Sequence, residues 1–486
     1  MVQGTSSWAG KSLLVTVLCR HFARQGLRVA PFKAQNMSNN ARVAVRGDSG
    51  HWGEIGTAQW LQARAAWAEP NVRMNPVLVK PEGETRSQVV VDGVVDAELS
   101  ALPWRRRGPL LRPVVERALT GLLDDTDLVV LEGAGSPAEI NLSDVDLANT
   151  AAAQIADAAV LLVADIDRGG AFAHLYGTWA LLEPAARKRI AGFVLNKFRG
   201  DASLLPPAPE RLTELTGVPL LGVLPMLDHD LPDEDGAAVP STQYWRDRPV
   251  VAVVRYPYAS NLDEFKPLEQ VAQLRWAQTP GALADADLVV LPGSKHVSAD
   301  LRWLRSNGIG DEVVCRARAG QRVLGICGGL QMLGRALRND GGGDGDTTGL
   351  GLLPLQTSFR ADKVVAEVST PFPADLDGPW EALAGQRLYG YEIRHGRTEA
   401  IAGSKPLPGA EPVDEIAAAR PEQRGWRAGP ILGLTVHGIF ENPHLVKAVL
   451  GRSPGRSLDA AIDELTDAVV AHLDLTRIEE LTGISR

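Results

Sequence analysis

The sequence predicts an α/β protein with two doubly wound, mostly parallel sheets, and three observations lead to this fold class. The chain has 486 residues, which is too long for one ordinary hydrophobic core. Short apolar runs bounded by turn residues alternate with helical patterns, as expected for parallel strands covered by helices. Acidic, Gly and Pro residues interrupt this pattern between residues 231 and 248. We therefore expect a first domain over residues 1–230, a linker over 231–248, a second domain over 249–450 and a helical cap over 451–486.

The composition excludes several classes of protein. Hydrophobic residues make up 45% of the chain and charged residues 22%, and the net charge of −9 is spread along it, which argues against nucleic acid or an anionic membrane as a partner. The basic cluster at residues 105–107 is interpreted as a solvated loop, with contact to a polycarboxylate substrate as the alternative. Three cysteines at unrelated spacings predict neither a disulfide framework nor a metal site. No apolar run could span a bilayer and no signal pattern opens the sequence, so we expect a cytoplasmic protein with small-molecule partners.

The start of the chain has the pattern of a phosphate-binding loop. Gly4, Thr5 and Gly10 belong to a Gly-rich turn before Lys11 and Ser12, with one residue more between the glycines than is usual. Backbone N–H groups of such a loop hold phosphates, the Lys neutralises them, and the Ser hydroxyl binds Mg²⁺. Because so few residues precede Gly4, we expect either that the strand that normally leads into such a loop is cut short or missing, or that the start of the chain has been assigned too late.

The elements after this loop predict a parallel sheet. A helix with Leu14, Leu18 and Phe22 on one face ends before Gly26, and an Ala-rich helix follows residues 53–56. Strands are expected over residues 27–32, 74–81, 128–131, 160–164, 192–195 and 220–224.

Polar residues follow three of these strands at the edge where nucleotides bind. Glu132 comes directly after one buried strand and is expected to bind Mg²⁺, with a loop-capping role as the alternative. Asp165, Asp167, Asn196 and Lys197 follow two later strands. Because the carboxyl ends of parallel strands share one edge of a sheet, these side chains are candidates for nucleotide contacts.

The second domain is organised around a cysteine at a strand-to-helix turn. Residues 323–333 form a short apolar run that ends in Gly-x-Cys-x-Gly and passes directly into a helical pattern, with Cys327 at the apex. In such a nucleophile elbow the N–H of Gly328 would both lower the thiol pKa and bind an oxyanion. Gly293, which follows a predicted strand over residues 288–291, could supply a second oxyanion N–H. The alternative is that Cys327 is a small buried hydrophobic residue.

A histidine at the end of a later strand completes the predicted site. Strands are expected over residues 250–254, 390–393 and 431–436, and the last of these delivers His437. Because a base must reach a thiol in space and not in sequence, we predict that His437 is the general base for Cys327. A structural histidine is the alternative, and we assign that role to His296, His395 and His444.

These residues resemble a known family. The first half is similar to the dethiobiotin-synthetase-like ATP-binding domains, whose phosphate loop has the longer spacing, and the second half resembles a class I glutamine amidotransferase domain. Fusion in this order occurs in the corrinoid amidases. Within them, seven ordered segments resemble the cobyric acid synthase family, namely residues 31–38, 53–56, 74–76, 132–142, 165–170, 196–201 and 437–442.

The resemblance implies ATP- and glutamine-dependent amidation of the b, d, e and g carboxylates of adenosylcobyrinic acid a,c-diamide, which gives adenosylcobyric acid in cobalamin biosynthesis. It implies acyl phosphates as intermediates, Mg²⁺ bound with ATP, and the corrinoid as a substrate and not a cofactor. The residues that carry over are Cys327 and His437 as the glutaminase pair; Lys11, Ser12 and Glu132 as ATP and Mg²⁺ contacts; and Lys33, Gln35, Asn36 and Glu54 as tentative contacts to substrate or phosphate.

The sequence departs from the family pattern at two places. Trp8 stands where the family usually has a small acidic residue, so the nucleotide contacts at the loop tip are open. Ile439 stands where class I domains place a carboxylate two residues after the base, so the group that orients His437 is unknown from the sequence. Two other functions stay open: the sister enzyme that amidates the a and c carboxylates of cobyrinic acid, and a P-loop protein with an inactive glutaminase.

Overall fold

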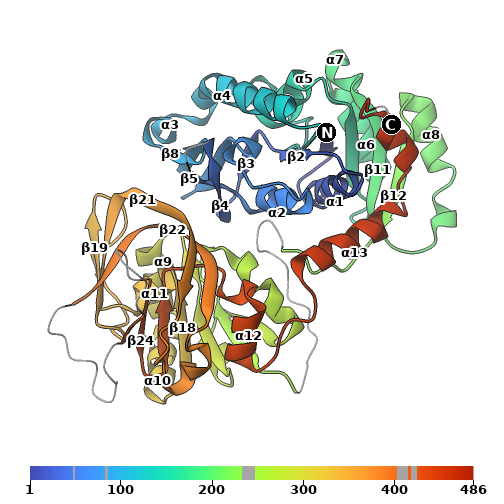
Figure 1. Cartoon of the computed structure of the whole chain (residues 1–486). Coiled ribbons are helices and arrows are strands. Elements are labelled where there is room, and N and C mark those ends of the chain that lie inside the picture. The colour runs from blue at the N-terminus through green and yellow to red at the C-terminus, as the bar shows by residue number, and fades with distance from the viewer. Residues whose placement is uncertain (48–49, 83–85, 233–246, 402–413, 417–423, 485–486) are drawn as a thin grey trace. The chain divides into compact units, whose positions relative to one another are not determined.

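A computed structural model describes residues 1–47, 50–82, 86–232, 247–401, 414–416 and 424–484. The chain divides into two compact units, which are Met1–Leu231 with Ser457–Arg486 and Pro232–Arg456 (Figure 1). Most of the linker predicted over residues 231–248 lies outside the described residues. The α/β fold class with two mostly parallel sheets is confirmed, because each unit contains such a sheet.

The first unit is built on parallel strands whose carboxyl ends share one edge. Its four-stranded sheet has the order β1 (Val2–Gly4), β10 (Val160–Asp165), β11 (Ile190–Phe198) and β12 (Leu220–Pro225). A second parallel pair, β2 (Val29–Phe32) with β9 (Leu128–Leu131), is joined to β1 by a bridge between Val2 and Glu132. The strands are short, apolar and buried, as the sequence pattern predicts.

Helices and smaller strands surround this sheet. The main helices are α1 (Lys11–Arg24), α2 (Thr57–Ala65), α4 (Trp104–Asp125), α6 (Ala171–Leu181) and α8 (Ala208–Thr216), with the shorter α3 (Ala97–Ala101), α5 (Ala152–Ile155) and α7 (Pro184–Arg187). A further sheet contains β3 (Gln35–Met37), β6 (Val77–Pro81), β7 (Ser87–Val91) and β8 (Val94–Asp96), and β4 (Ala41–Arg46) pairs with β5 (His51–Gly56). Strands β3, β4, β5, β7 and β8 were not predicted from the sequence.

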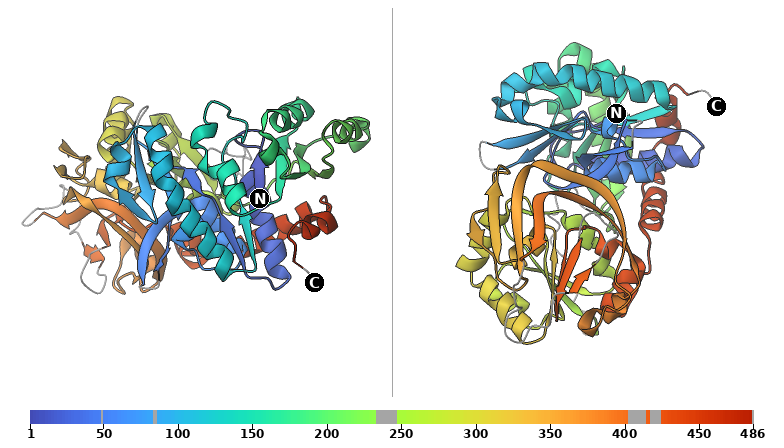
Figure 2. Two further views of the ribbon diagram at one scale, coloured as in Figure 1. Left: turned by 90° about the horizontal axis from the view of Figure 1, so that it is seen from above. Right: turned by 60° about the vertical axis from the view of Figure 1, so that its left-hand side comes forward.

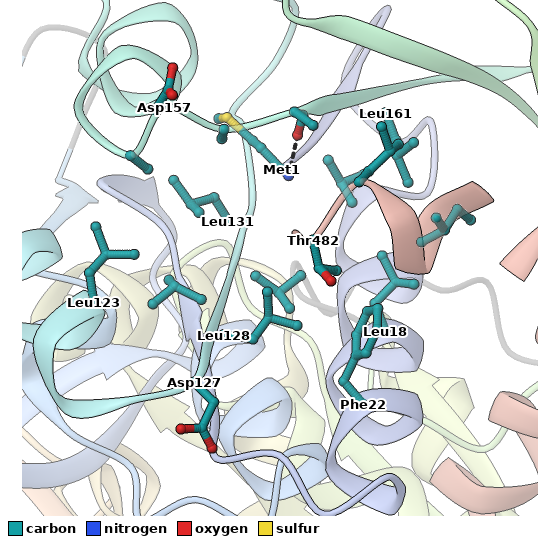
Figure 3. A pocket seen from close by; sticks show the side chains of 18 residues that line it. Met1, Leu18, Phe22, Leu123, Asp127, Leu128, Leu131, Asp157, Leu161 and Thr482 are labelled. Carbon is teal, nitrogen blue, oxygen red and sulfur yellow. Dashed lines mark hydrogen bonds between the residues drawn. The ribbon is translucent and has the colours of Figure 1, made fainter. Parts of the chain in front are cut away.

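The expectation that the first strand is missing is wrong. Strand β1 pairs in parallel with β10, with Val2 opposite Leu161, and the Met1 amino group continues the ladder by donating to the Ala159 carbonyl oxygen at 2.7 Å. Burial lowers the pKa of this amino group to about 5. A cavity of about 240 Å³ lies beside it, and Figure 3 shows apolar side chains such as Leu18 and Phe22 together with Asp127 and Asp157 in its lining. Three residues are enough here because β10 supplies the ladder on one side.

The interpretation of residues 105–107 as a solvated loop is also wrong, because these residues lie in the first turns of α4. Arg105 forms an ion pair with Asp144 at 2.7 Å, whereas Arg107 is buried and donates to the carbonyl oxygens of Ser100 and Leu102 at 2.9 Å. Pro109 and Pro113 lie inside this helix, and because proline usually breaks helices, the sequence did not indicate one here. The buried face of α4 nevertheless has helical spacing, with Leu111, Val115, Ala118 and Leu122.

The last two helices belong to the first unit. Helix α13 (Leu458–Val470) packs its apolar face against α1, and α14 (Leu475–Glu480) follows. The guanidinium of buried Arg20 on α1 contacts Asp459 at 2.8 Å and Asp463 at 3.4 Å. Of the segment expected as a helical cap over residues 451–486, the part from Ser457 onward therefore belongs to the first unit, whereas residues 451–456 belong to the second.

The second unit contains a seven-stranded sheet. Its order is β15 (Gln273–Ala277), β13 (Val250–Val254), β16 (Leu288–Leu291), β18 (Arg322–Ile326), β25 (Ile431–Leu434), β24 (Gly425–Ala428) and β23 (Asp414–Ile416). The first five strands are parallel and the last two antiparallel. Helices α9 (Val297–Ser306), α10 (Ile309–Arg318), α11 (Gly328–Leu333) and α12 (Pro443–Leu450) connect or flank these strands.

Irregular elements carry much of the candidate site in this unit. They are the 3-10 helix η6 (Leu262–Gln270) and the antiparallel pair of β14 (Ala259–Ser260) with β17 (Gly293–Ser294). A second sheet contains β19 (Ala336–Asp340), β20 (Thr347–Thr348), β21 (Leu355–Pro371) and β22 (Arg387–Ala400), and Figure 2 shows β21 and β22 as long neighbouring orange strands. The prediction of a strand over residues 390–393 found only part of β22. Among the described residues no helix is long and apolar enough to cross a membrane.

Candidate active sites

Cys327 occupies the turn between β18 and α11 in the second unit. Its backbone has φ 49° and ψ −104°, a conformation that non-glycine residues rarely adopt, and its N–H donates to the Leu434 carbonyl oxygen at 2.7 Å. The side chain is 7% exposed. A Cβ atom at Gly329 would lie 1.9 Å from the carbonyl oxygen of Leu291, so the turn requires glycine at this position. The structure therefore contains the strained strand-to-helix turn that the Gly-x-Cys-x-Gly pattern predicts.

His437 lies next to this cysteine, directly after β25 and Thr435–Val436 in the chain. Its ring is buried, stacks on Tyr391 with 5.2 Å between ring centroids, and its backbone N–H donates to the Tyr391 carbonyl oxygen at 2.9 Å. Burial by itself lowers the pKa of His437. The charges of Glu264 and Cys327, and the hydrogen bonds to both, outweigh burial and raise this pKa to about 10. The structure thus brings the predicted thiol and base together.

Glu264 is the carboxylate that the sequence analysis missed. Its Oε1 atom lies 2.8 Å from Nδ1 of His437, and its Oε2 accepts the N–H of Gly438 at 2.7 Å. The two contacts fix both the ring and the backbone that carries it, and they leave Nε2 of His437 for the thiol. Glu264 is fully buried and comes from η6, 173 residues before His437. No local spacing links two residues so far apart, so the sequence carried no signal for this pairing.

The Gly293–Ser294 strand forms a wall of the same site. A Cβ atom at Gly293 would lie 2.8 Å from Cε1 of His437, and one at Gly328 would lie 2.6 Å from the backbone nitrogen of Ser294. The two glycines expected as oxyanion donors thus lie on backbones that meet beside Cys327 and His437. Their role in binding an oxyanion stays a prediction.

The three histidines assigned structural roles lie in other contacts. Nδ1 of His395 is 3.1 Å from the Arg360 carbonyl oxygen, and Nε2 of His444 is 2.8 Å from the Arg387 carbonyl oxygen. His296 lies 3.3 Å from a carboxylate oxygen of Asp344.

The predicted phosphate loop connects β1 to α1 in the first unit. Lys11 is buried, and its ammonium group donates to the carbonyl oxygens of Ser6 at 2.9 Å and Gly135 at 3.1 Å. Thr5 donates its backbone N–H to the Val163 carbonyl oxygen at 2.9 Å, and its buried hydroxyl has no hydrogen-bond partner among the described residues. A Cβ atom at Gly4 would lie 3.0 Å from the Lys11 ammonium nitrogen, so the loop closes tightly around the lysine.

Glu132 is the centre of a buried polar cluster at the end of β9. Its Oε1 accepts from the Ser12 hydroxyl at 2.9 Å and from the Lys33 ammonium at 2.8 Å, and its Oε2 accepts from the Gln62 amide at 2.5 Å. Ser12 and Glu132, predicted from two distant stretches of sequence, therefore meet. Lys33, one of the tentative substrate contacts, joins them.

The oxygens of Ser12 and Glu132 suit Mg²⁺. A hydroxyl and a carboxylate lie within hydrogen-bond distance of each other beside the phosphate loop, and Mg²⁺ in nucleotide sites takes one or two protein oxygens with the remainder from phosphates and water. The described residues contain no group of three or more His, Cys, Asp or Glu side chains that could hold a metal by themselves. This donor set fits an ion that arrives with a nucleotide better than one held by protein ligands alone.

Asn196 and Lys197 lie against the tip of the phosphate loop. Asn196 donates from Nδ2 to the Ala9 carbonyl oxygen at 2.9 Å, and the ammonium of Lys197 donates to the Trp8 carbonyl oxygen and to Asp165, both at 2.8 Å. A Cβ atom at Gly10, where φ is 102°, would lie 1.9 Å from Nδ2 of Asn196. Trp8 has a positive φ of 64° and is half-exposed, so its backbone is held by Lys197 while its indole reaches solvent.

The remaining tentative contacts are not gathered around Glu132. Asn36 donates to Gln59 at 3.0 Å, and Glu54 forms a buried ion pair with Lys80. Gln35 is half-buried on β3. The structure therefore joins Lys33 to the Mg²⁺ candidates and places Asn36 and Glu54 in separate buried contacts.

Two family models match the chain. The CobQ/CobB/MinD/ParA nucleotide binding domain matches residues 1–235, and the CobB/CobQ-like glutamine amidotransferase domain matches residues 250–445. Together they span both halves in which the two candidate sites lie.

Curated proteins from several bacteria are similar over nearly the whole length. A cobyric acid synthase from Polaromonas sp. strain JS666 is 51% identical over 501 residues, covering 98% of this chain and 96% of that protein. The cobyric acid synthase from Polaromonas naphthalenivorans strain CJ2 is 52% identical over 483 residues, covering 98% and 97%. That from Paracidovorax citrulli strain AAC00-1 is 53% identical over 479 residues, covering 96% of each chain.

Proposed function

The chain belongs to the cobyric acid synthase family, and from this premise we propose that it amidates the b, d, e and g carboxylates of adenosylcobyrinic acid a,c-diamide through acyl phosphates. The family membership makes it a glutamine-dependent amidotransferase of cobalamin biosynthesis that uses ATP. The choice of carboxylates, the intermediates, the metal and the residue roles are the proposal. Because ATP and glutamine are abundant in the cytoplasm, we propose that the reaction takes place there.

One observation carries the proposal, which is the buried arrangement of Cys327, His437 and Glu264. A thiol beside an imidazole, with a carboxylate behind the imidazole, is the arrangement that nucleophilic attack on an amide needs. A purely structural histidine has no need of a charged partner on one side and a strained cysteine on the other. The family match supports the same conclusion, because the second unit matches a glutamine amidotransferase model.

The glutaminase half-reaction follows from these three residues. The thiol proton resides on His437, whose raised pKa keeps it there, so Cys327 attacks the side-chain carboxamide carbon of glutamine as a thiolate, and the C–N bond breaks as His437 gives this proton to the departing ammonia. Water then attacks the resulting thioester with His437 as base, which releases glutamate and restores the thiol. Glu264 stabilises the imidazolium that forms in each half of this cycle.

The synthetase half-reaction needs activation, because a carboxylate would have to expel oxide to react with ammonia. Transfer of the γ-phosphoryl group of ATP to the carboxylate gives an acyl phosphate and ADP, and ammonia then displaces inorganic phosphate to form the amide. In the proposed site, Lys11 and the loop amides hold the phosphates of ATP, and Ser12 with Glu132 would hold Mg²⁺, which neutralises charge on those phosphates when bound. Lys33 is placed through Glu132 and would neutralise the incoming carboxylate or phosphoryl group.

Mass spectrometry of the corrinoid product tests the function directly. Incubation of the full chain with MgATP, glutamine and adenosylcobyrinic acid a,c-diamide should give stepwise losses of one mass unit, one for each acid converted to an amide. Glutamate should appear in step with these losses. Turnover of cobyrinic acid instead of the a,c-diamide, or consumption of ATP without release of glutamate, would contradict the proposal.

A cysteine variant tests the division of labour between the two sites. Cys327→Ser should lower glutamine-driven amidation about 10³-fold or more and leave ammonium-driven amidation within twofold, because only the first route needs the thiol. Product formation from each nitrogen source is the measurement. Cys315→Ser is the matched control, since that cysteine is exposed on α10, and it should leave both routes unchanged. Loss of both routes in Cys327→Ser alone would contradict separable sites.

A further inference from the structure

Asp300, on the first turn of α9, connects the two short strands β14 and β17. Its Oδ2 accepts the hydroxyl of Ser294 at 2.6 Å, and its Oδ1 accepts the backbone N–H of Tyr258 at 3.0 Å. Ser294 ends β17, and Tyr258 immediately precedes β14, which pairs antiparallel with β17. One carboxylate therefore ties both strands of this pair to a helix.

The strand that Asp300 holds is the wall of the glutaminase site. Gly293 approaches the ring of His437, and the backbone of Ser294 approaches Gly328 at the start of α11, as the glycine contacts above show. The other end of the same turn is held as well, because the hydroxyl of buried Tyr256 donates to the Pro292 carbonyl oxygen. Among the described residues, β14 and β17 form a two-stranded sheet of their own, which a backbone hydrogen bond from Lys295 to Tyr258 extends. The side-chain anchors add to these backbone contacts in fixing the position of the wall.

A carboxylate at this buried position lowers the stability of the fold. Asp300 is fully buried, and its hydrogen-bond donors are a neutral hydroxyl and a neutral backbone N–H. Burial, opposed by the two hydrogen bonds and assisted by the charge of Asp344, raises the pKa of Asp300 to about 7. A buried carboxylate whose hydrogen-bond donors are neutral is destabilising, and stability alone favours an apolar residue at such a position. A carboxylate at position 300 is explained if its two oxygens are needed to hold β14 and β17 at the same time.

We propose that Asp300 is a positioning residue of the glutaminase, which holds the Gly293–Ser294 strand against Cys327 and His437 so that this strand can stabilise the oxyanion of the thioester-forming step. The inference rests on the proposed function, because it requires that Cys327 attack a glutamine amide. The hydrogen bonds of Asp300 go to Ser294 and Tyr258, and not to the Cys327 thiol or the His437 imidazole. Its effect passes through the hydroxyl of Ser294 and the N–H of Tyr258.

Three variants of the full chain test this role. Asp300→Ala removes both acceptors and should lower kcat for glutamine hydrolysis about 10²-fold, the scale seen when one oxyanion donor is lost. Ser294→Ala removes only the hydroxyl and should lower kcat about tenfold, with no further loss when it is added to Asp300→Ala. Asp300→Asn keeps one acceptor for Tyr258 and can donate to Ser294, so it should recover most of the activity.

Two further measurements separate positioning from general damage. Alkylation of Cys327 by iodoacetamide, followed at that residue by peptide mass spectrometry, needs no oxyanion site and should stay within twofold in Asp300→Ala. Ammonium-driven amidation should also stay within twofold. Asp311→Ala, an exposed acid on the first turn of α10, is the matched control and should change none of these rates.

Several outcomes would overturn the inference. These are a kcat for Asp300→Ala within threefold of the wild type, no effect of Ser294→Ala, or equal losses in alkylation, ammonium-driven and glutamine-driven rates. Where Asp300→Ala does not fold, Ser294→Ala decides: a kcat about tenfold lower with unchanged alkylation supports the role, and an unchanged kcat overturns it. A wild-type chain that amidates the corrinoid with neither nitrogen source would instead refute the proposed function, which keeps the two failures distinct.

Discussion

At the scale of single residues, the chemistry of the second unit depends on how charges are buried around His437. An imidazole in an apolar interior is normally neutral, because burial disfavours its charged form. Here a buried carboxylate on Nδ1 and the cysteine on the other side reverse that preference, so the protonated ring persists to about pH 10. The same carboxylate binds the N–H of Gly438 and so prevents the ring from turning away.

Replacement of Glu264 tests this account. Glu264→Gln removes the charge that raises the pKa of His437, so this pKa should fall toward its ordinary value. The alkaline limb of kcat/KM for glutamine hydrolysis should then move down from about pH 10 by about one unit or more. The sign follows because a raised folded-state pKa keeps the proton on the ring at higher pH, and loss of the partner releases it sooner. The rate at neutral pH should fall about 10²-fold or more.

The control for this prediction is Glu269→Gln on the same 3-10 helix. Glu269 forms an ion pair with Lys266 at 2.8 Å, and Lys266 is not a residue of the candidate site. Its pH profile should superimpose on that of the wild type. A Glu264→Gln profile that also superimposes would show that Glu264 does not set the protonation of His437.

At the scale of elements, close backbone approach decides where the reactive side chains point. The elbow works because β16, β18 and the start of α11 pack with glycine between them, which leaves no room for a side chain on the inner face of the turn. The phosphate loop follows the same principle, since Gly10 turns with a positive φ directly against Asn196. In both units a short strand thus ends in a turn that only glycine permits, and a helix begins immediately after it.

The close packing of the turn around Cys327 predicts how one methyl group added at Gly329 would act. Gly329→Ala would place a Cβ 1.9 Å from the Leu291 carbonyl oxygen, and since that neighbour is backbone, β16 or α11 must shift. We expect a loss of about 1–3 kcal/mol in the free energy of unfolding of the second unit, measured by denaturant titration. The rate of glutamine hydrolysis should fall by at least the factor that corresponds to this free energy, because Cys327 moves with the turn.

Gly281→Ala provides the comparison for this substitution. A Cβ at Gly281, also in the second unit, would meet nothing within 4 Å. It should change the free energy of unfolding by no more than about 0.5 kcal/mol. Equal stability of the two variants would mean that the turn is looser than the contacts indicate.

At the scale of the whole molecule, the chain leaves the first unit, forms the second and returns. Residues 457–486 complete the core of the first unit, where Ile462, Leu465 and Val469 pack with residues of α1. Arg20 and Arg24 of α1 reinforce this contact through ion pairs with acidic residues of α13. The end of the chain therefore stabilises the unit that contains the phosphate loop and not the glutaminase unit beside it in sequence.

Leu465→Ala tests this assignment. Truncation of a buried leucine should lower the stability of the first unit by about 2–5 kcal/mol. In a denaturant titration, ATP-dependent amidation with ammonium should be lost at a lower denaturant concentration, whereas glutamine hydrolysis should be lost where it is lost in the wild type. Leu215→Ala, a half-exposed leucine on α8, should leave both midpoints in place. A shift in the glutaminase midpoint alone would contradict the assignment.

The sequence by itself determined the fold class, most parallel strands and the pairs Cys327 with His437 and Ser12 with Glu132. Strand and helix periodicity, glycine-dependent turns and residues at strand ends are local features, and parallel strands bring their carboxyl ends to one edge wherever they lie in the chain. Only the tertiary structure decided that Glu264 orients His437, that Asp300 anchors the wall beside them, and that the last helices return to the first unit. These contacts join residues far apart in the chain through packing, and no periodicity or spacing in the sequence encodes them.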